Sequence, residues 1–150
     1  MSHSFTHILI HYIFSTKNRE KLLAESLQSR IWSYMAGIAI NNDIHPQIIG
    51  GVEDHVHALL LIPKTISVAK AIQLIKGGSS GWIHDTFPKL KNFAWQEGYG
   101  AFSVSLSNKQ KVINYINNQK KHHRRKTFKE EFIEFLKRHE IEYDERYIWD

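Results

Sequence analysis

Residues 54–62 read DHVHALLLI and lie near the middle of this 150-residue chain. The apolar run predicts a buried strand, which Pro63 ends because proline cannot donate a hydrogen bond to a sheet ladder. A second strand is expected at residues 44–50. The pair Gly50-Gly51 between them predicts a hairpin turn.

Helical patterns flank this hairpin on both sides. Residues 21–41 place apolar side chains about 3.6 residues apart, which indicates an amphipathic helix. Beyond the hairpin, Ser67 is a suitable N-cap for a helix at residues 68–76. The glycines of residues 77–81 could end or interrupt that helix.

Strand patterns lie outside these helices, at residues 5–16 and 101–106. The resulting order of strand, helix, strand, strand, helix, strand is the split βαβ pattern (βαββαβ). We therefore expect an α+β, ferredoxin-like sandwich with an antiparallel sheet. Further helices at residues 108–121 and 128–139 follow, the latter as an added C-terminal helix.

The composition indicates a single domain over residues 1–150, with an acidic, aromatic C-terminal tail from about residue 140. The chain has no cysteine, which excludes disulfides and thiolate zinc sites. It begins without the pattern of a signal peptide, and no apolar run approaches the roughly 20 residues of a membrane span. We expect a cytoplasmic protein with no membrane partner.

The formal net charge of +5 is unevenly distributed. Residues 98–129 contain eight Lys or Arg and no acid, so this stretch carries +8 and the rest of the chain −3. Such a block can bind phosphates, although a solvated helix face is the alternative. The candidate phosphate-binding residues are Lys109, Lys111, Lys120, Lys121, Arg124, Arg125 and Lys126. The candidate base-stacking residues, each with core packing as the alternative, are Trp82, Phe87, Phe93, Trp95, Tyr99 and Phe102.

His55 and His57 form the first chemical motif. Alternate residues of a strand point to the same face, with Cα atoms roughly 6.6 Å apart. Two imidazoles at this spacing can converge on one divalent metal ion. A purely structural or surface role for the pair is the alternative.

Tyr115 and Gln119 form the second motif, four residues apart on the basic helix. This spacing puts them one turn apart on one face. A tyrosine hydroxyl can act as a covalent nucleophile, and a glutamine carbonyl is a neutral oxygen ligand for a cation. Core packing of Tyr115 is the alternative.

These motifs occur within longer segments that together resemble a known family. The segments are GGVEDHVH at residues 50–57, YINNQ at 115–119 followed by His122-His123, FSTKNR at 14–19 and WQEGYGAFSVS at 95–105. In this order they resemble the single-tyrosine HUH transposases of the insertion-sequence 200/605 type. The resemblance extends to related domesticated transposases associated with bacterial repeated palindromes.

The resemblance implies an enzyme that cleaves and rejoins single-stranded DNA at hairpin-flanked sites through a 5′-phosphotyrosine. Tyr115 would attack the scissile phosphate, and His55, His57 and Gln119 would bind Mg²⁺ or Mn²⁺. It also implies a homodimer, in which the tyrosine helix of one chain could serve the histidines of the other.

Three alternatives remain open from the residues alone. The chain could hold single-stranded nucleic acid without cutting it, which would make Tyr115, His55 and His57 incidental. It could be a metal-dependent hydrolase that uses water, which would make Tyr115 dispensable. It could also be a domesticated family member that cuts repeat hairpins without transposing.

Overall fold

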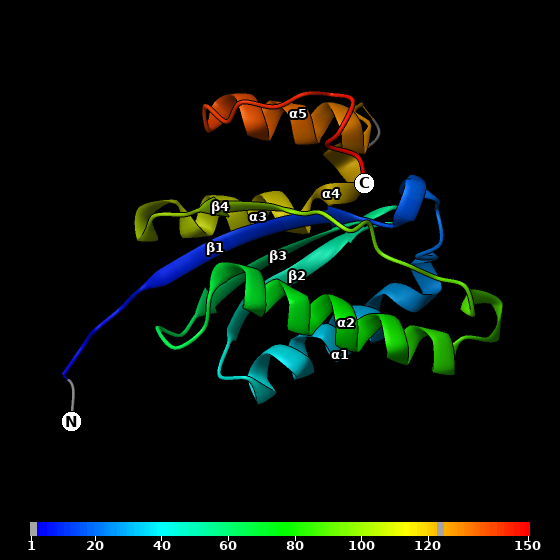
Figure 1. The fold of residues 1–150 in the computed structure, drawn as a ribbon, viewed down its shortest axis with the longest axis horizontal. Coiled ribbons are helices and arrows are strands. Elements are labelled where there is room, and N and C mark those ends of the chain that lie inside the picture. Colours follow the sequence, from blue (N-terminus) through cyan, green and yellow to red (C-terminus); the bar gives the residue numbers. More distant parts are fainter. Residues whose placement is uncertain (1–2, 123–124) are drawn as a thin grey trace.

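A four-stranded antiparallel sheet organises the chain, in a computed structural model that describes residues 3–122 and 125–150 (Figure 1). Its strands are β1 (Ile8–Ser15), β2 (His45–Val52), β3 (His55–Ile62) and β4 (Gly100–Ser103). They lie in the order β2-β3-β1-β4, and all neighbours are antiparallel. The expected α+β, ferredoxin-like fold is confirmed.

Two long helices, α1 (Glu25–Asn41) and α2 (Val68–Thr86), cover one face of the sheet (Figure 1). Strand residues alternate between faces, so the even-numbered residues of β1 and β3 point toward these helices. Tyr12, Phe14 and Leu60 are fully buried in this main core. Burial of these large side chains is the principal force holding the first layer to the sheet.

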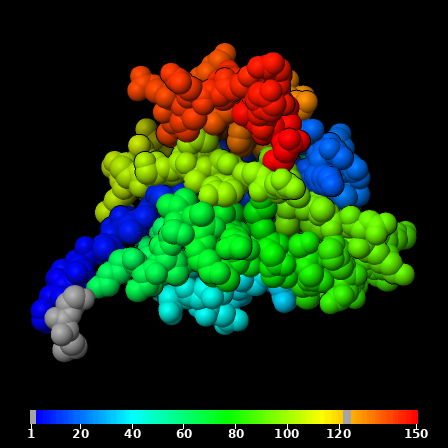
Figure 2. Space-filling model, in the orientation of Figure 1, coloured from blue at the N-terminus to red at the C-terminus, as the bar shows by residue number. Residues whose placement is uncertain are grey.

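The opposite face carries α3 (Lys109–Asn117), α4 (Gln119–His122) and α5 (Phe128–Arg138). Elsewhere in the chain, short 3₁₀ turns lie at Lys17–Arg19, Pro88–Leu90 and Leu106–Asn108. α3 contacts β2 and β3. Three phenylalanines of α5 pack with Ile13 of β1 and Phe102 of β4. Figure 2 shows α5 and the C-terminal tail as a cap on one side of the molecule. Odd-numbered residues of β1 and β3 therefore face α3 and α5.

The expected hairpin turn at Gly50-Gly51 is wrong by three residues. Both glycines lie within β2, and the turn is made by Glu53 and Asp54. A Cβ on Gly50 would lie 3.1 Å from Ile116, and one on Gly51 would lie 2.2 Å from the carbonyl oxygen of His55. These glycines allow close packing within the sheet rather than reversal of the chain.

The glycines of residues 77–81 do not end a helix, because α2 continues to Thr86. Tertiary packing outweighs their low helix propensity. A Cβ on Gly78 would lie 2.8 Å from Ile38, so glycine permits α1 and α2 to approach closely. Ser79 and Ile83, further along the helix, are fully buried.

The helix expected at residues 108–121 is divided in two. Asn118, with φ −102° and ψ 22°, caps α3, and α4 begins at Gln119. The expected fourth strand is also shorter than predicted, since β4 ends at Ser103 and a 3₁₀ turn follows from Leu106. Within residues 3–122 and 125–150, no helix has the length and apolarity needed to cross a membrane.

Candidate active site

His55 and His57 lie at the start of β3, on the face covered by α3 and α5. Both side chains are completely buried, and their ring centroids are 5.2 Å apart. Val56 between them points into the main core on the other face. The strand therefore presents the two imidazoles side by side, as the alternating pattern predicts.

Asp54 orients His55. The Nδ1 atom of His55 lies 2.6 Å from Oδ1 of Asp54, and since a carboxylate can only accept, Nδ1 donates. Burial by itself lowers the pKa of His55, but its hydrogen bonds to Asp54 and Glu131 outweigh this effect and raise the pKa to about 9. This arrangement directs Nε2 of His55 into the site.

His11 of β1 supports His57 in a similar way. Its Nε2 atom lies 2.8 Å from Nδ1 of His57. Burial, followed by the neighbouring His57, holds the pKa of His11 well below its usual value. A neutral His11 can donate to or accept from Nδ1 of His57, so it fixes that ring in either tautomer.

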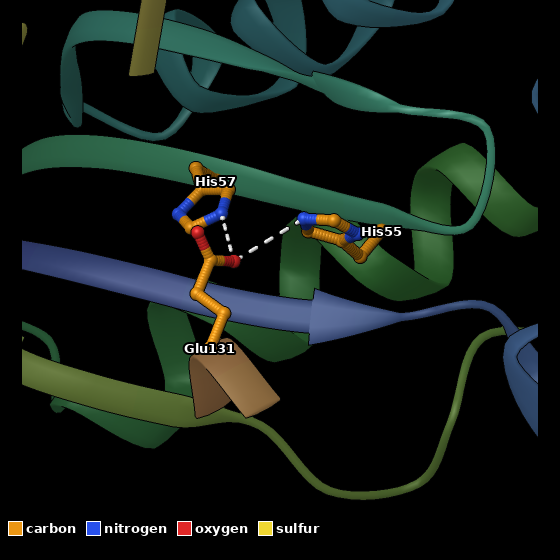
Figure 3. Close-up of side chains that lie close together, drawn as sticks. All are labelled: His55, His57 and Glu131. Carbon is orange, nitrogen blue, oxygen red and sulfur yellow. Dashed lines mark hydrogen bonds and ion pairs between the residues drawn. The ribbon is translucent and has the colours of Figure 1, made fainter. Parts of the chain in front are cut away.

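Glu131 of α5 completes a cluster with the two histidines (Figure 3). Its Oε1 atom lies 3.0 Å from Nε2 of His57 and 3.3 Å from Nε2 of His55. These three donor atoms lie within 4.8 Å of one another, close enough to hold one metal ion. Gln119 lies beside them, with Oε1 at 3.3 Å from Nε2 of His55.

Tyr115 reaches the same carboxylate from α3. Its hydroxyl donates to Oε2 of Glu131, and its ring centroid lies 5.8 Å from that of His57. Burial, together with the charge of Glu131, raises the pKa of the Tyr115 phenol. The side chain amide of Gln119 lies 3.3 Å from the carbonyl oxygen of Tyr115, so the break at Asn118 leaves the two residues together.

The half-buried Tyr115 lines a cleft between α3, α4 and α5, which we call the tyrosine cleft. Its volume is about 670 Å³. Four cations line it: Lys121, Arg125, Lys126 and Arg138. Lys126 is paired with Glu134, whereas Lys121 and Arg125 have no carboxylate within ion-pairing distance in the described part of the chain. The cleft can therefore attract a phosphate next to a phenol.

The other predicted phosphate-binding residues lie elsewhere. Lys120 is paired with Glu25 of α1. Lys109 and Lys111 lie in the first turn of α3 and do not line the tyrosine cleft, although Lys111 is one helical turn before Tyr115. Arg124 lies outside the described residues, as do His123 and the side chain of His122.

Most of the predicted base-stacking aromatics are core residues. Phe87, Phe93, Trp95 and Phe102 are buried, leaving Trp82 and Tyr99 partly exposed. Backbone hydrogen bonds and the side chain of Gln96 fix the segment at residues 95–98 in place. Oε1 of Gln96 accepts a hydrogen bond from the amide of Ser15 at 2.7 Å. Lys76 donates to the carbonyl oxygens of residues 96, 97 and 98. This segment therefore supports the end of β1.

The sequence patterns did not lead us to predict Glu131 as a site residue. It lies three residues after Phe128 and four before Phe135, which places an acid on the apolar stripe of an otherwise amphipathic helix. That position, unlike those of Glu130 and Glu134, was a signal for a buried carboxylate.

Residues 4–119 match the sequence profile of a family described as IS200-like transposases. The chain belongs to this family. Its members are transposases, enzymes that cut and transfer DNA. The ISDra2 transposase TnpA of Deinococcus radiodurans is 24% identical over 114 residues, which is 73% of this chain and 81% of that relative.

Two solved structures resemble this transposase. One, from Deinococcus radiodurans R1 and assigned as a transposase, has a TM-score of 0.66 and 23% identity, covering 79% of this chain and 95% of that one. The other, a REP-associated tyrosine transposase bound to a REP hairpin, has a TM-score of 0.60 and 14% identity, covering 82% and 74%. At these identities the likeness supports the fold alone.

Proposed function

We propose that this transposase cleaves and rejoins single-stranded DNA through a 5′-phosphotyrosine on Tyr115. The observation that carries the proposal is the buried carboxylate of Glu131, which contacts the Tyr115 hydroxyl with one oxygen and both strand histidines with the other. A nucleophile, a proton acceptor and a candidate metal site thus meet at one wall of a basic cleft. A plain binding module has no need for this buried arrangement.

In the proposed step, the Tyr115 oxygen attacks the scissile phosphorus. The bond from phosphorus to the tyrosine oxygen forms, and the bond from phosphorus to the 3′ oxygen breaks. The phenol proton passes to Oε2 of Glu131, and the departing 3′ oxygen takes up a proton from solvent water to become a free hydroxyl. One phosphodiester replaces another, so the 3′-hydroxyl of a second strand can reverse the step and join the DNA without ATP.

The donor set fits a divalent metal, as two imidazole nitrogens and a carboxylate oxygen converge. We propose His55, His57 and Glu131 as ligands, with Gln119 close enough to add its oxygen. Mn²⁺ accepts this mixed set more readily than Mg²⁺, which prefers oxygen. A bound ion would supply Lewis-acid stabilisation of charge on the phosphate oxygens.

Hairpin DNA is the proposed substrate, supported by the similar transposase solved with a REP hairpin. Such a substrate is consistent with the cytoplasmic location that the composition predicts. The homodimer implied by the resemblance stays a prediction. Since Tyr115 contacts Glu131 of its own chain, we further propose that one chain can complete the cleavage site.

The test is incubation with single-stranded DNA from the flanks of the gene and Mn²⁺, followed by a denaturing gel. Tyr115→Phe should lower cleavage by several orders of magnitude and abolish the covalent adduct, because it removes the attacking oxygen. DNA binding should persist. Mass spectrometry of the trapped wild-type complex should place the nucleotide on the peptide containing Tyr115.

Tyr143→Phe is the matched control, since Tyr143 packs near α5 outside the cluster. It should cleave normally. Continued cleavage by Tyr115→Phe would favour a water-dependent hydrolase instead, and an adduct on Tyr99 or Tyr143 would show that another tyrosine is the nucleophile.

A further inference from the structure

A second cavity lies across the α3–α4 junction from the tyrosine cleft. It has a volume of about 480 Å³ and is bounded by Trp32 of α1, residues 49–51 of β2 and residues 116–121. We call it the edge-strand cavity, because β2 is an edge strand of the sheet. Its size is within the range of small-molecule binding sites.

The edge-strand cavity adjoins the proposed cleavage site, because the two hollows share lining residues. Asn118 and Lys121 line both the cavity and the tyrosine cleft. Gln119 lines the cavity and also lies 3.3 Å from Nε2 of His55. A strand whose scissile phosphate lies beside Tyr115 can therefore pass over Asn118 and place its neighbouring nucleotide in the cavity.

The lining offers the chemistry that an unpaired nucleotide requires. The half-buried indole of Trp32 supplies a flat surface for base stacking. The exposed Asn117 and Asn118 carry amides suited to the edges of bases, and Lys121 carries a positive charge suited to phosphate. Among the described residues, no acid lines the cavity, although Glu25 pairs with the lining residue Lys120.

Two glycines of β2 lie in the wall of the edge-strand cavity. Gly50 and Gly51 are required for packing against Ile116 and His55, so they do not by themselves indicate a ligand. Both glycines line the cavity together with Ile49 and Ile116.

We propose that the edge-strand cavity binds one unpaired nucleotide next to the scissile phosphate, with its base stacked on Trp32 and its phosphate on Lys121. This inference rests on the proposed function for the position of the scissile phosphate. The binding itself can be measured without any cleavage.

The test uses Tyr115→Phe protein and a short oligothymidylate carrying 5-iododeoxyuridine as a photo-cross-linking probe. Peptide mapping should find a cross-link at Trp32. Trp32→Leu in the same background should weaken oligothymidylate binding about tenfold, because the aliphatic side chain fills space without stacking. Trp32→Phe should restore most of the affinity.

Trp82→Leu is the matched control. Trp82 is also a half-buried indole on the helical layer, but it stacks on Tyr34 and lies outside the cavity. Its replacement should leave the affinity unchanged, and thermal unfolding checks that both leucine variants are folded.

Equal affinities for Trp32→Leu and Trp82→Leu, or cross-links confined to other residues, would overturn the subsite. So would a change of oligomeric state on Trp32 replacement with no change in DNA affinity, which would make the β2 edge a contact between chains. Failure of the proposed function can be distinguished from failure of this subsite. In that case the wild-type protein would form no covalent DNA adduct at Tyr115.

Discussion

Glu131 is the residue on which the candidate site depends. A buried carboxylate is costly unless it is paired, and Glu131 has the Tyr115 hydroxyl and two imidazoles as partners. The carboxylate of Glu131 therefore holds the cluster together. Without these partners, its burial would destabilise the folded protein. Any ion bound by His55 and His57 would share that carboxylate.

Metal binding should stabilise the wild-type protein and depend on Glu131. At a Mn²⁺ concentration about 100 times its Kd, the expected gain is about 2.7 kcal/mol of unfolding free energy relative to protein in EDTA. Glu131→Gln removes the charge, and a tenfold loss of affinity would reduce this gain by about 1.3 kcal/mol. Thermal unfolding with and without Mn²⁺ measures both values.

Glu142→Gln is the control at this scale, because Glu142 is exposed on the tail. It should retain the full Mn²⁺ effect. An equal Mn²⁺ gain in Glu131→Gln and wild type would remove Glu131 from the ligand set.

Helix α5 is the element that brings Glu131 to the sheet. Its first turn is fixed by a capping box, in which the Thr127 side chain accepts from the amide of Glu130 and the Glu130 side chain accepts from the amide of Thr127. Glu131 follows directly, within that first turn. Order at the start of α5 thus sets the position of the carboxylate relative to the histidines.

Thr127→Ala should lower stability by about 1 kcal/mol through loss of the N-cap, and should also weaken Mn²⁺ binding because the first turn of α5 frays. Ser67→Ala provides the comparison, since Ser67 caps α2 through the amide of Lys70 at 2.9 Å, away from the site. It should cost similar stability but leave Mn²⁺ affinity intact. Urea unfolding and Mn²⁺ titration separate the two effects, and identical Mn²⁺ affinities in both variants would contradict a special role for the α5 cap.

At the scale of the whole molecule, the C-terminal tail fastens α5 to the rest of the fold. Trp149 packs against Phe128 and Phe132 of α5, and its carbonyl accepts a hydrogen bond from Arg19 at 2.9 Å. The amide of Gly98 donates to the carbonyl oxygen of Asp150 at 2.8 Å. The tail therefore links α5 to the loops that follow β1 and precede β4.

Trp149→Ala should destabilise the protein by about 2 kcal/mol, roughly half the cost at a fully buried site, because Trp149 is only partly buried. Hydrogen exchange should accelerate in α5 more than in β1 and β3, since α5 loses its fastening while the sheet keeps its own ladder. Tyr147→Ala, at a side chain that is 69% exposed, should change neither quantity by much. Uniform acceleration across all elements would argue against a local fastening.

The sequence by itself determined the order of strands and helices, since periods of 2 and 3.6 are local properties of the chain. It also determined that His55 and His57 share a face, because alternation along a strand requires it. It did not locate the turn after β2 or the length of α2, because glycines that permit close packing and glycines that reverse the chain look the same in one dimension.

Only the tertiary structure decided which face of the sheet the histidines occupy and what else reaches them. Glu131 is separated from His57 by 74 residues, and its carboxylate turns inward because the Phe128, Phe132 and Phe135 side chains around it bury themselves against β1 and β4. The same packing brings Tyr115 to that carboxylate from another helix. Contacts of this kind depend on which hydrophobic surfaces pack against each other in the folded chain. No local pattern in the sequence specifies which residues will meet.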